Sequence, residues 1–544
     1  MKKEIYLKKT LSQIPRVLSL QDRDVSSQNY GCFDRSFWAW KFKDFPDASL
    51  QRAVYPLSLI YSLNSEDNSY FKNENLANWI KTGMMFWTKI QHKNGSFDQA
   101  FPNEYSFGAT AFTSRPLIES FLVMRGRFSP AEEKILLNSI DKAADFLFKN
   151  KETHGFISNH LSGAALALYQ AGELLKNEKY KEQSQKIINL ILKNQSKEGW
   201  FREYEGSDPG YETLGIYYLA EYYKKTKDEK ILEALKKSIE FLSFFVHPDG
   251  TFGGEYGSRN TEIFYPAGLE IMEKYIPLAG KIKKAISEEK TVSLASLDNE
   301  NLIPLMENYL EAYLAPNEEN QFIDLKLPFE KKGERFFEES KIYAKSASSY
   351  YLICNAAKGG VIKIFDKKKR SLIFDDAGFF GEIKKGKIIT SQIFNDKAKI
   401  NFKEGSLEIA TNFLEVRREG INPLKLIILR ILNLTFFRNV FLGNLIKKSL
   451  IKKMITKKNR YPVELERKII LKEDKIEIDD VLTKNKNIKF KWLEYGKNFS
   501  AIHMGSAKYF QLYQLIRKEK PTAIDLDRLN KENRITVKNI FEFI

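Results

Sequence analysis

Apolar side chains recur at helical spacing through roughly the first 290 residues. One such stretch holds Leu76, Trp79, Ile80, Met84 and Trp87, which share a face because residues three and four apart on a helix are neighbours. A second stretch begins at Ser-Pro-Ala-Glu (129–132), where an N-cap, a first-turn proline and a capping-box glutamate coincide, and runs to about residue 150. Residues 180–194 and 229–246 form two more predicted helices.

The predicted helices end repeatedly in turns where an aromatic residue follows a glycine within two positions. These glycines are Gly95, Gly155, Gly199 and Gly250, so the intervals are 60, 44 and 51 residues. Each interval holds two helices and a turn, and a single helical hairpin cannot bury its own apolar face. The pattern predicts an α/α toroid of helical hairpins over residues 1–290. The alternative is an irregular helical domain whose helices happen to end at glycine.

The pattern changes after about residue 295, where short runs of strand composition are separated by turn signals. The clearest runs are residues 350–365, 372–383, 406–416, 475–482 and 534–544. They predict a β-rich domain over residues 295–544 in which antiparallel sheets stack as a β-sandwich. An apolar, helix-compatible and basic insertion interrupts it at about 421–456. The fold class we expect is therefore multidomain α+β.

Composition narrows the chemistry of this globular chain of 544 residues, of which 43% are hydrophobic and 13% aromatic. Its two cysteines, Cys32 and Cys354, offer neither a disulfide framework nor a metal-binding spacing. Glycine-rich phosphate loops, dinucleotide fingerprints and zinc motifs are missing too, so we expect no cofactor and no metal. The basic N-terminus has no apolar core typical of a secretory signal, which predicts a cytoplasmic protein.

The net charge of +17 is concentrated in one segment. Between Arg417 and Arg460 there are twelve Lys or Arg and one acid, Glu419, a local charge of +11. This distribution does not indicate nucleic-acid binding and favours a local anionic partner. One interpretation places residues 421–456 on the inner face of a membrane, with the apolar side in the lipid interface and the lysines on acidic headgroups. The other is a pair of buried helices with a solvated lysine face.

Three polar clusters fall at predicted hairpin turns, which in a toroid line one mouth. An Asn–His pair opens a helix and suits a substrate carboxylate, although the asparagine has an alternative role as a helix cap. The next two clusters are a long aromatic loop at 199–211 and a glycine-rich loop at 250–266, and each is alternatively a plain connector. The candidate residues are Asn159, His160, Arg202, Glu205, Tyr211, Tyr256, Arg259, Asn260 and Glu262.

Two earlier segments combine aromatic with polar residues and suit a groove in which rings stack on sugars. The candidates there are Trp38, Trp40, Asn103 and Glu104. A structural network beneath the toroid explains them equally well. All these residues together predict a site for an anionic oligosaccharide or polysaccharide.

The motifs ISNH (157–160), GWFREYEGSDPGY (199–211) and FFEESKIYAKSASSYYLICNAAKGG (336–360) resemble the heparinase II/III-like polysaccharide lyases. The resemblance implies an α/α toroid followed by stacked antiparallel sheets, and β-elimination on uronic-acid polysaccharides. It implies that Asn159 and His160 neutralise the substrate carboxylate and that Tyr211 is a general acid or base. This chain departs from the family in having no histidine shortly after Gly359-Gly360.

The expected chemistry is abstraction of the C5 proton of a uronate, followed by elimination or by reprotonation from the opposite face, which is epimerisation. Catalytic candidates are Asn159, His160, Tyr211 and Tyr256, and we expect Arg202 or Arg259 to lower the pKa of a catalytic tyrosine. The setting we expect is surface-polysaccharide metabolism. Two alternatives stay open: a non-catalytic glycan-binding scaffold, and a glycoside hydrolase whose paired carboxylates come from Asp98, Glu104, Glu205, Asp208 or Glu262.

Overall fold

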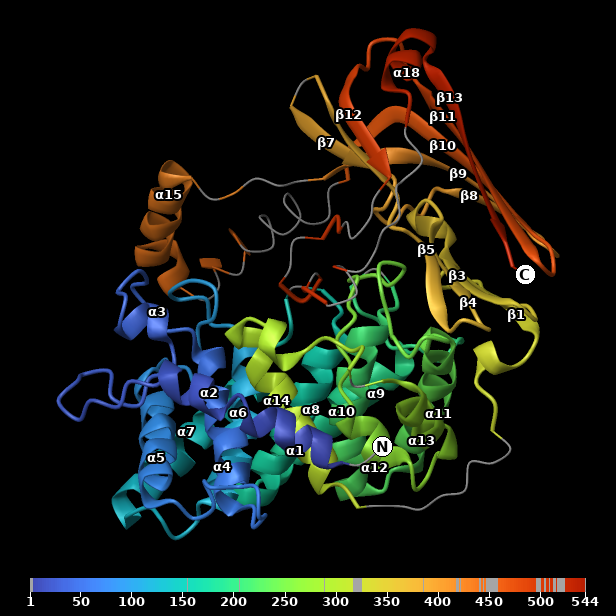
Figure 1. The fold of residues 1–544 in the computed structure, drawn as a ribbon. Helices are drawn as coiled ribbons and strands as arrows, with labels where there is room; N and C mark the ends of the chain where they lie inside the picture. The colour runs from blue at the N-terminus through green and yellow to red at the C-terminus, as the bar shows by residue number, and fades with distance from the viewer. Residues whose placement is uncertain are drawn as a thin grey trace.

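The computed structural model consists of a helical part followed by β-sheets (Figure 1). It describes residues 3–153, 155–204, 206–287, 289–316, 325–384, 386–416, 420, 422–439, 442–443, 445–446, 458–495, 500–502, 505–507, 509–511, 515 and 524–543. The predicted α+β class is confirmed.

The helical part is a closed ring of hairpins. Successive inner helices pack side by side in chain order, and the last of them, α14, packs back against the first, α4. The inner helices are α4 (Val54–Ser62), α6 (Phe107–Val123), α8 (Ser158–Leu175), α10 (Pro209–Thr226), α12 (Ala267–Met272) and α14 (Asn299–Leu314). The predicted toroid is thereby confirmed, and because α14 closes the ring, its helices continue beyond residue 290. The two-domain boundary near 290–295 remains a prediction.

A second layer of helices surrounds the ring and shows the amphipathic pattern from which it was predicted. In α7 the Ser129 hydroxyl caps the Glu132 N–H and the Glu132 side chain returns to Ser129, with Pro130 at the first position. The outer helices are α5 (Glu74–Lys89), α7 (Pro130–Lys149), α9 (Glu178–Lys193), α11 (Glu229–Leu242) and α13 (Pro277–Ala285). Short helices α1 (Glu4–Leu11), α2 (Ile14–Leu20) and α3 (Arg35–Trp38) precede them.

Two of the four glycine turns, those at Gly95 and Gly199, have the same structure. Gly95 and Gly199 have φ of 89° and 105°, and a Cβ on either would lie within 2.3 Å of a carbonyl oxygen of the next outer helix. Gln91 and Gln195, four residues earlier, each donate both to the glycine carbonyl and to that next helix. The side-chain amide therefore fixes each turn against the following hairpin.

The first sheet has the strand order β1-β2-β3-β4-β5, all antiparallel. Its strands are β1 (Gly333–Phe337), β2 (Ile342–Ser346), β3 (Tyr350–Asn355), β4 (Val361–Asp366) and β5 (Ser371–Asp376). Strands β3 and β4 are buried along their whole length because the two faces of the sheet meet different partners. One face joins the core of the toroid through Tyr351, Ile353 and Phe365, and the other packs on the second sheet.

The second sheet has the order β12-β6-β7-β9-β10-β11-β13, with β8 paired to β9. Along its strands, buried residues on the core side alternate with more exposed residues on the solvated side. The alternation is clear in β9 and β11, which the sequence predicted as strands. The strands are β6 (Phe379–Ile383), β7 (Lys387–Thr390), β8 (Lys399–Lys403), β9 (Ser406–Val416), β10 (Arg460–Leu471), β11 (Lys475–Lys484), β12 (Phe490–Tyr495) and β13 (Arg534–Glu542). Helix α18 (Leu526–Glu532) precedes β13.

The basic insertion leaves the second sheet after β9. Its described part forms α15 (Pro423–Leu434) and the short turn Phe436–Arg438, while residues 421, 440, 441, 444 and 447–456 of the predicted segment lie outside the described residues. In Figure 1, α15 lies beside α3, away from the sheets. Among the helices that the structure describes, none is long and apolar enough to cross a bilayer.

Candidate active site

The turns before α8 and α10 and the loop after α11 are joined by hydrogen bonds on the side of the toroid that faces the β-sheets. Asp208, at the start of α10, is fully buried, and its Oδ1 accepts from the Tyr211 N–H at 3.0 Å. Its Oδ2 accepts from the Arg259 N–H at 2.7 Å and from the Thr261 N–H at 3.4 Å. One carboxylate therefore caps a helix and also binds the 250–262 loop to it.

Asn159 is held by a buried acid from the neighbouring loop. The two oxygens of Glu203 accept from the Asn159 backbone N–H at 2.9 Å and from its side-chain amide at 2.7 Å. Burial raises the pKa of Glu203 to about 8, with Asp208 adding to the rise and Arg259 opposing it. The contact fixes the orientation of the Asn159 amide, and the residue is only 3% exposed.

His160 lies next to Asn159 and keeps part of its ring accessible, with 24% of the side chain exposed. Its Nδ1 is 2.7 Å from a carboxylate oxygen of Glu152, whose side chain is 2% exposed. Phe112 of α6 packs edge-on against the ring, and Gly108 leaves room for it. Because Glu152 orients Nδ1, the opposite nitrogen Nε2 is the one available to a ligand.

Tyr211 connects the toroid to the loops of the β-rich part. Its hydroxyl donates to the Ser506 hydroxyl at 2.7 Å, and the side chain is only partly buried. Burial raises the pKa of Tyr211 to about 12, and the Ser506 hydrogen bond and Arg259 offset this only in part. Arg259 lowers this pKa in the expected direction, but the net shift is upward because loss of hydration outweighs the cationic charge.

Arg259 stacks on Tyr204, with its guanidinium carbon 3.9 Å from the ring centroid. Within the described part of the chain its Nε is buried and has no hydrogen-bond partner. A buried donor without a partner is costly, so an incoming anion would relieve it. Arg202, by contrast, is exposed and donates to the Tyr204 carbonyl at 3.0 Å.

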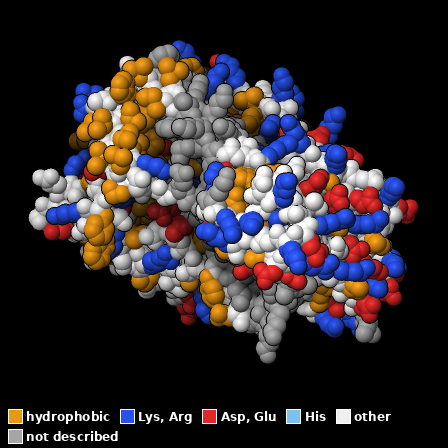
Figure 2. Space-filling model, turned by 90° about the horizontal axis from the view of Figure 1, so that it is seen from above, with side chains coloured by type: hydrophobic (Ala, Val, Ile, Leu, Met, Phe, Trp, Pro, Cys, Tyr) orange, Lys and Arg blue, Asp and Glu red, His pale blue; other side chains and the backbone are white. Residues whose placement is uncertain are grey.

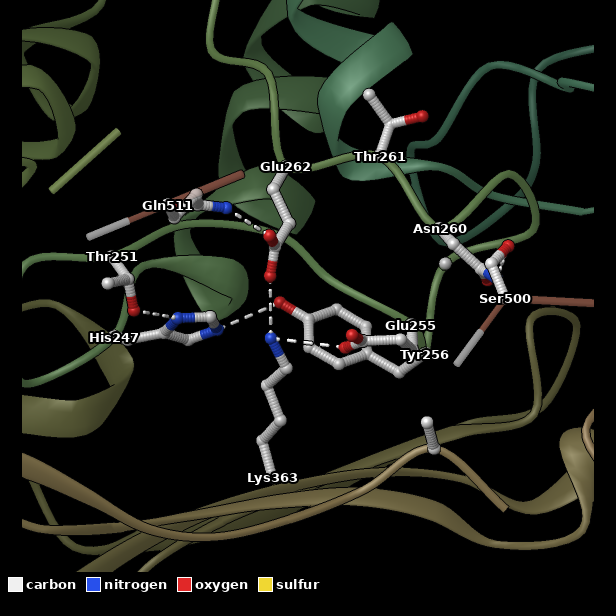
Figure 3. A network of polar contacts seen from close by, with 12 residues as sticks. His247, Thr251, Glu255, Tyr256, Asn260, Thr261, Glu262, Lys363, Ser500 and Gln511 are labelled. Atoms are coloured by element: carbon white, nitrogen blue, oxygen red, sulfur yellow. Dashed lines mark hydrogen bonds and ion pairs between the residues drawn. The ribbon is translucent and has the colours of Figure 1, made fainter. Parts of the chain in front are cut away.

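Tyr256 belongs to a network of polar contacts between the 250–262 loop and the first sheet (Figure 3). It is fully buried, and its hydroxyl lies 2.9 Å from Nε2 of His247, whose Nδ1 contacts Thr251. Burial raises the pKa of Tyr256 far above its usual value and, together with Lys363, lowers the pKa of His247. Both groups are therefore neutral at physiological pH.

Asn260 and Glu262 bind the β-rich part. Asn260 accepts from the Lys358 ammonium at 2.5 Å and donates to Ser500 at 2.8 Å. Glu262 pairs with Lys363 of β4 at 2.8 Å and accepts from Gln511 (Figure 3). These contacts join the 250–262 loop to the sheets, and a role in substrate binding remains a prediction for both residues.

The four earlier candidates lie around the insertion and the segment before α4. The indole N–H of Trp38 donates to the Leu20 carbonyl, whereas Trp40 is 62% exposed. Asn103 donates to the Asn433 carbonyl of α15 at 2.9 Å, and the buried Glu104 accepts from two backbone N–H groups of its own loop. Glu205 lies outside the described residues.

The carboxylates considered for a hydrolase are mostly committed to structural bonds. Asp98 accepts from His92 and from the backbone N–H groups of Asn103 and Tyr105. Asp208, Glu104 and Glu262 are bound as described above. Among the described residues no group of three His, Cys, Asp or Glu side chains is arranged to hold a metal ion.

Sequence reasoning did not select Glu152, Glu203 or Tyr204 as site residues, and it named Asp208 only as a carboxylate of the alternative hydrolase. Glu203, Tyr204 and Asp208 stand in a loop that was singled out for its polarity, but their roles depend on which loop each one meets. Glu152 precedes His160 by eight residues, and nothing in its local sequence indicates that the two side chains touch.

The fold places the chain in a recognisable class. It resembles the chondroitin AC lyase of Streptomyces coelicolor A3, solved with chondroitin sulphate, with a TM-score of 0.57, 8% identity, and coverage of 90% of this chain and 67% of the other. It also resembles a Paenibacillus xanthan lyase, with a TM-score of 0.50, 9% identity, and coverage of 91% of this chain and 46% of the other. The protein thus has the α/α-toroid polysaccharide-lyase fold, and the resemblance stated from its motifs is confirmed.

One sequence-family model matches part of the chain. Residues 47–265 match the family model described as the ulvan lyase N-terminal domain, a range that contains the loops of the candidate site. None of the curated protein sequences compared with the chain matches it.

Proposed function

We propose that this protein acts on a uronic-acid-containing polysaccharide by abstracting the C5 proton, as a lyase or an epimerase, in surface-polysaccharide metabolism. The observation that carries the proposal is the joining of three toroid loops around Asp208 and Glu203. This arrangement brings His160, Tyr211 and Arg259, all partly accessible, to the side that faces the β-sheets. The lyase fold and the ulvan lyase family match support the same substrate class.

Substrate binding is assigned to Asn159 and Arg259. The donors for the uronate carboxylate are the Asn159 amide and the Nε of Arg259, which has no hydrogen-bond partner among the described residues. Negative charge moves onto that carboxylate when the C5 proton leaves, and fixed donors stabilise it without reorganisation. Glu203 keeps the Asn159 amide in the required orientation.

Proton transfer is assigned to His160 and Tyr211. His160, oriented by Glu152, accepts the C5 proton at Nε2. Tyr211 is protonated at neutral pH and is therefore suited to act as the acid. In elimination, the C4–O bond breaks, a C4=C5 double bond forms and Tyr211 protonates the leaving oxygen. In epimerisation, the abstracted proton stays on His160 and Tyr211 donates its own proton to C5 on the opposite face.

The test is incubation of the full chain with uronate polysaccharides, including ulvan and chondroitin sulphate, in deuterated water. Ultraviolet absorbance of an unsaturated uronate supports the lyase, and deuterium at C5 without chain cleavage supports the epimerase. New reducing ends without either signal would replace the proposal with a glycoside hydrolase. Binding without turnover, unchanged by Tyr211→Phe, would show a glycan-binding scaffold.

A further inference from the structure

Helix α15 exposes a continuous apolar stripe to solvent. Leu424, Ile427, Ile428, Ile431 and Leu434 follow the spacing of one helix face, and each side chain is between 50% and 66% exposed. Figure 2 shows hydrophobic side chains gathered on the side of the molecule where α15 lies. A stripe of this size on a surface marks an interaction site rather than ordinary surface composition.

The opposite side of the insertion is already packed on the toroid. Phe437 is buried against Phe101 with ring centroids 5.5 Å apart, and the Asn433 carbonyl accepts from Asn103. The Arg430 guanidinium pairs with Asp44 at 2.8 Å. These contacts attach the helix to the toroid and leave its apolar stripe facing outward.

A second exposed apolar pair belongs to the segment that Arg430 contacts. Trp40 and Phe42 stack with ring centroids 6.1 Å apart and are 62% and 83% exposed. They alternate with Lys41 and Lys43 in the sequence Trp-Lys-Phe-Lys. Tryptophan and lysine side chains are enriched where a protein meets the headgroup region of a bilayer.

Positive charge favours one kind of occupant. The sequence of residues 417–460 carries a net +11, and among the described cations of this segment Lys425 and Arg438 are exposed at α15 and just beyond it. Apolar side chains flanked by cations suit an anionic lipid surface, because the chains enter the interface while the cations meet the headgroups. A protein partner on the stripe would benefit from this positive charge only if its own surface were strongly acidic.

We propose that α15, together with Trp40 and Phe42, docks the protein on the surface of an anionic lipid bilayer. Binding is peripheral: the stripe enters the interface and the toroid stays in water. In this arrangement Trp40 contacts lipid rather than sugar. The surface does not include His160 or Tyr211, so the proposal stands or falls independently of the enzymatic one.

The experiment is co-sedimentation of the full chain with phosphatidylcholine vesicles, with and without phosphatidylglycerol. We expect binding that requires the anionic lipid and a loss of at least about tenfold in partitioning for Ile427→Gln/Ile431→Gln. Lys425→Gln/Arg438→Gln should weaken binding and reduce its sensitivity to salt. The matched control is Ile135→Gln/Leu190→Gln, which changes two aliphatic side chains, each 45% exposed, on the outer helices.

A second measurement locates the surface. Lipids with brominated acyl chains should quench tryptophan fluorescence in the bound protein, and Trp40→Phe should remove most of that quenching. The proposal is overturned if the chain does not bind anionic vesicles, or if the control pair weakens binding as much as the α15 pair. It is also overturned if the α15 pair instead converts a dimer to a monomer, because a second copy would then be the occupant.

Discussion

At the scale of single residues, the hydroxyl of Tyr211 is the group most directly testable. Tyr211→Phe removes the acid but keeps the ring and its packing, so we expect turnover to fall roughly 10²–10⁴-fold with little change in stability. Tyr222→Phe is the matched control, since Tyr222 lies on the same helix and its hydroxyl bonds Gln185. Steady-state kinetics on the uronate polysaccharide that the chain turns over give the measurement, and equal losses in both variants would contradict the assignment.

Glu152 is a positioning residue, because it acts through His160. Glu152→Gln weakens the contact that orients the imidazole, and a displaced base costs about 10²-fold in kcat while KM stays nearly constant. Asp141→Asn, which alters the carboxylate contacted by the Tyr180 hydroxyl on the outer helices, is the control. A rise in KM with unchanged kcat would show that Glu152 serves binding instead.

At the scale of elements, Asp208 both caps α10 and binds the 250–262 loop. Comparison with an ordinary helix cap separates these two contributions to stability. Asp228 caps α11 through the Lys230 N–H, and Asp228→Ala should cost about 1 kcal/mol of unfolding free energy. Asp208→Ala also leaves the Arg259 and Thr261 N–H groups without their acceptor, so we expect roughly 3 kcal/mol. Urea unfolding measures both, and equal costs would show that the 250–262 loop does not depend on Asp208.

Most helices and strands could be predicted from the sequence where neighbouring residues decide the local structure. The α7 start at Ser129, the glycine turns and strands such as β9 and β11 follow from caps, φ requirements and alternation. Strands such as β1, β8 and β10 were not singled out, because their short or highly charged sequences become strands only beside a neighbour.

At the scale of the whole molecule, buried acids make stability depend on pH. Burial raises the pKa of Glu203 to about 8 and that of Asp47 to about 7, so the folded chain holds protons that the unfolded chain has released. Stability from these groups is complete below their unfolded pKa values near 4 and falls as pH rises towards 7 or 8. Each group lowers the unfolding free energy by about 1.4 kcal/mol per pH unit within its window.

Urea unfolding at a series of pH values tests this slope. Asp47→Asn keeps an oxygen acceptor for Ser49 but cannot titrate. The decline of the unfolding free energy between about pH 4 and 7 should therefore become shallower by the contribution of one carboxyl group. The control is Asp228→Asn, which removes a carboxyl that is only partly buried. An unchanged slope in Asp47→Asn would mean that this carboxyl is ionised in the folded protein throughout.

The sequence by itself determined the helical hairpins, the change to strands and the loops in which polar chemistry concentrates, because periodicity, caps and turn residues act over a few neighbouring positions. It also supplied Asn159, His160 and Tyr211 as candidates. Only the tertiary structure paired Glu203 with Asn159 and Glu152 with His160, and only it showed that burial raises the pKa of Tyr211. Those properties depend on which loops meet and how much water they exclude, and no local pattern encodes contacts between distant segments.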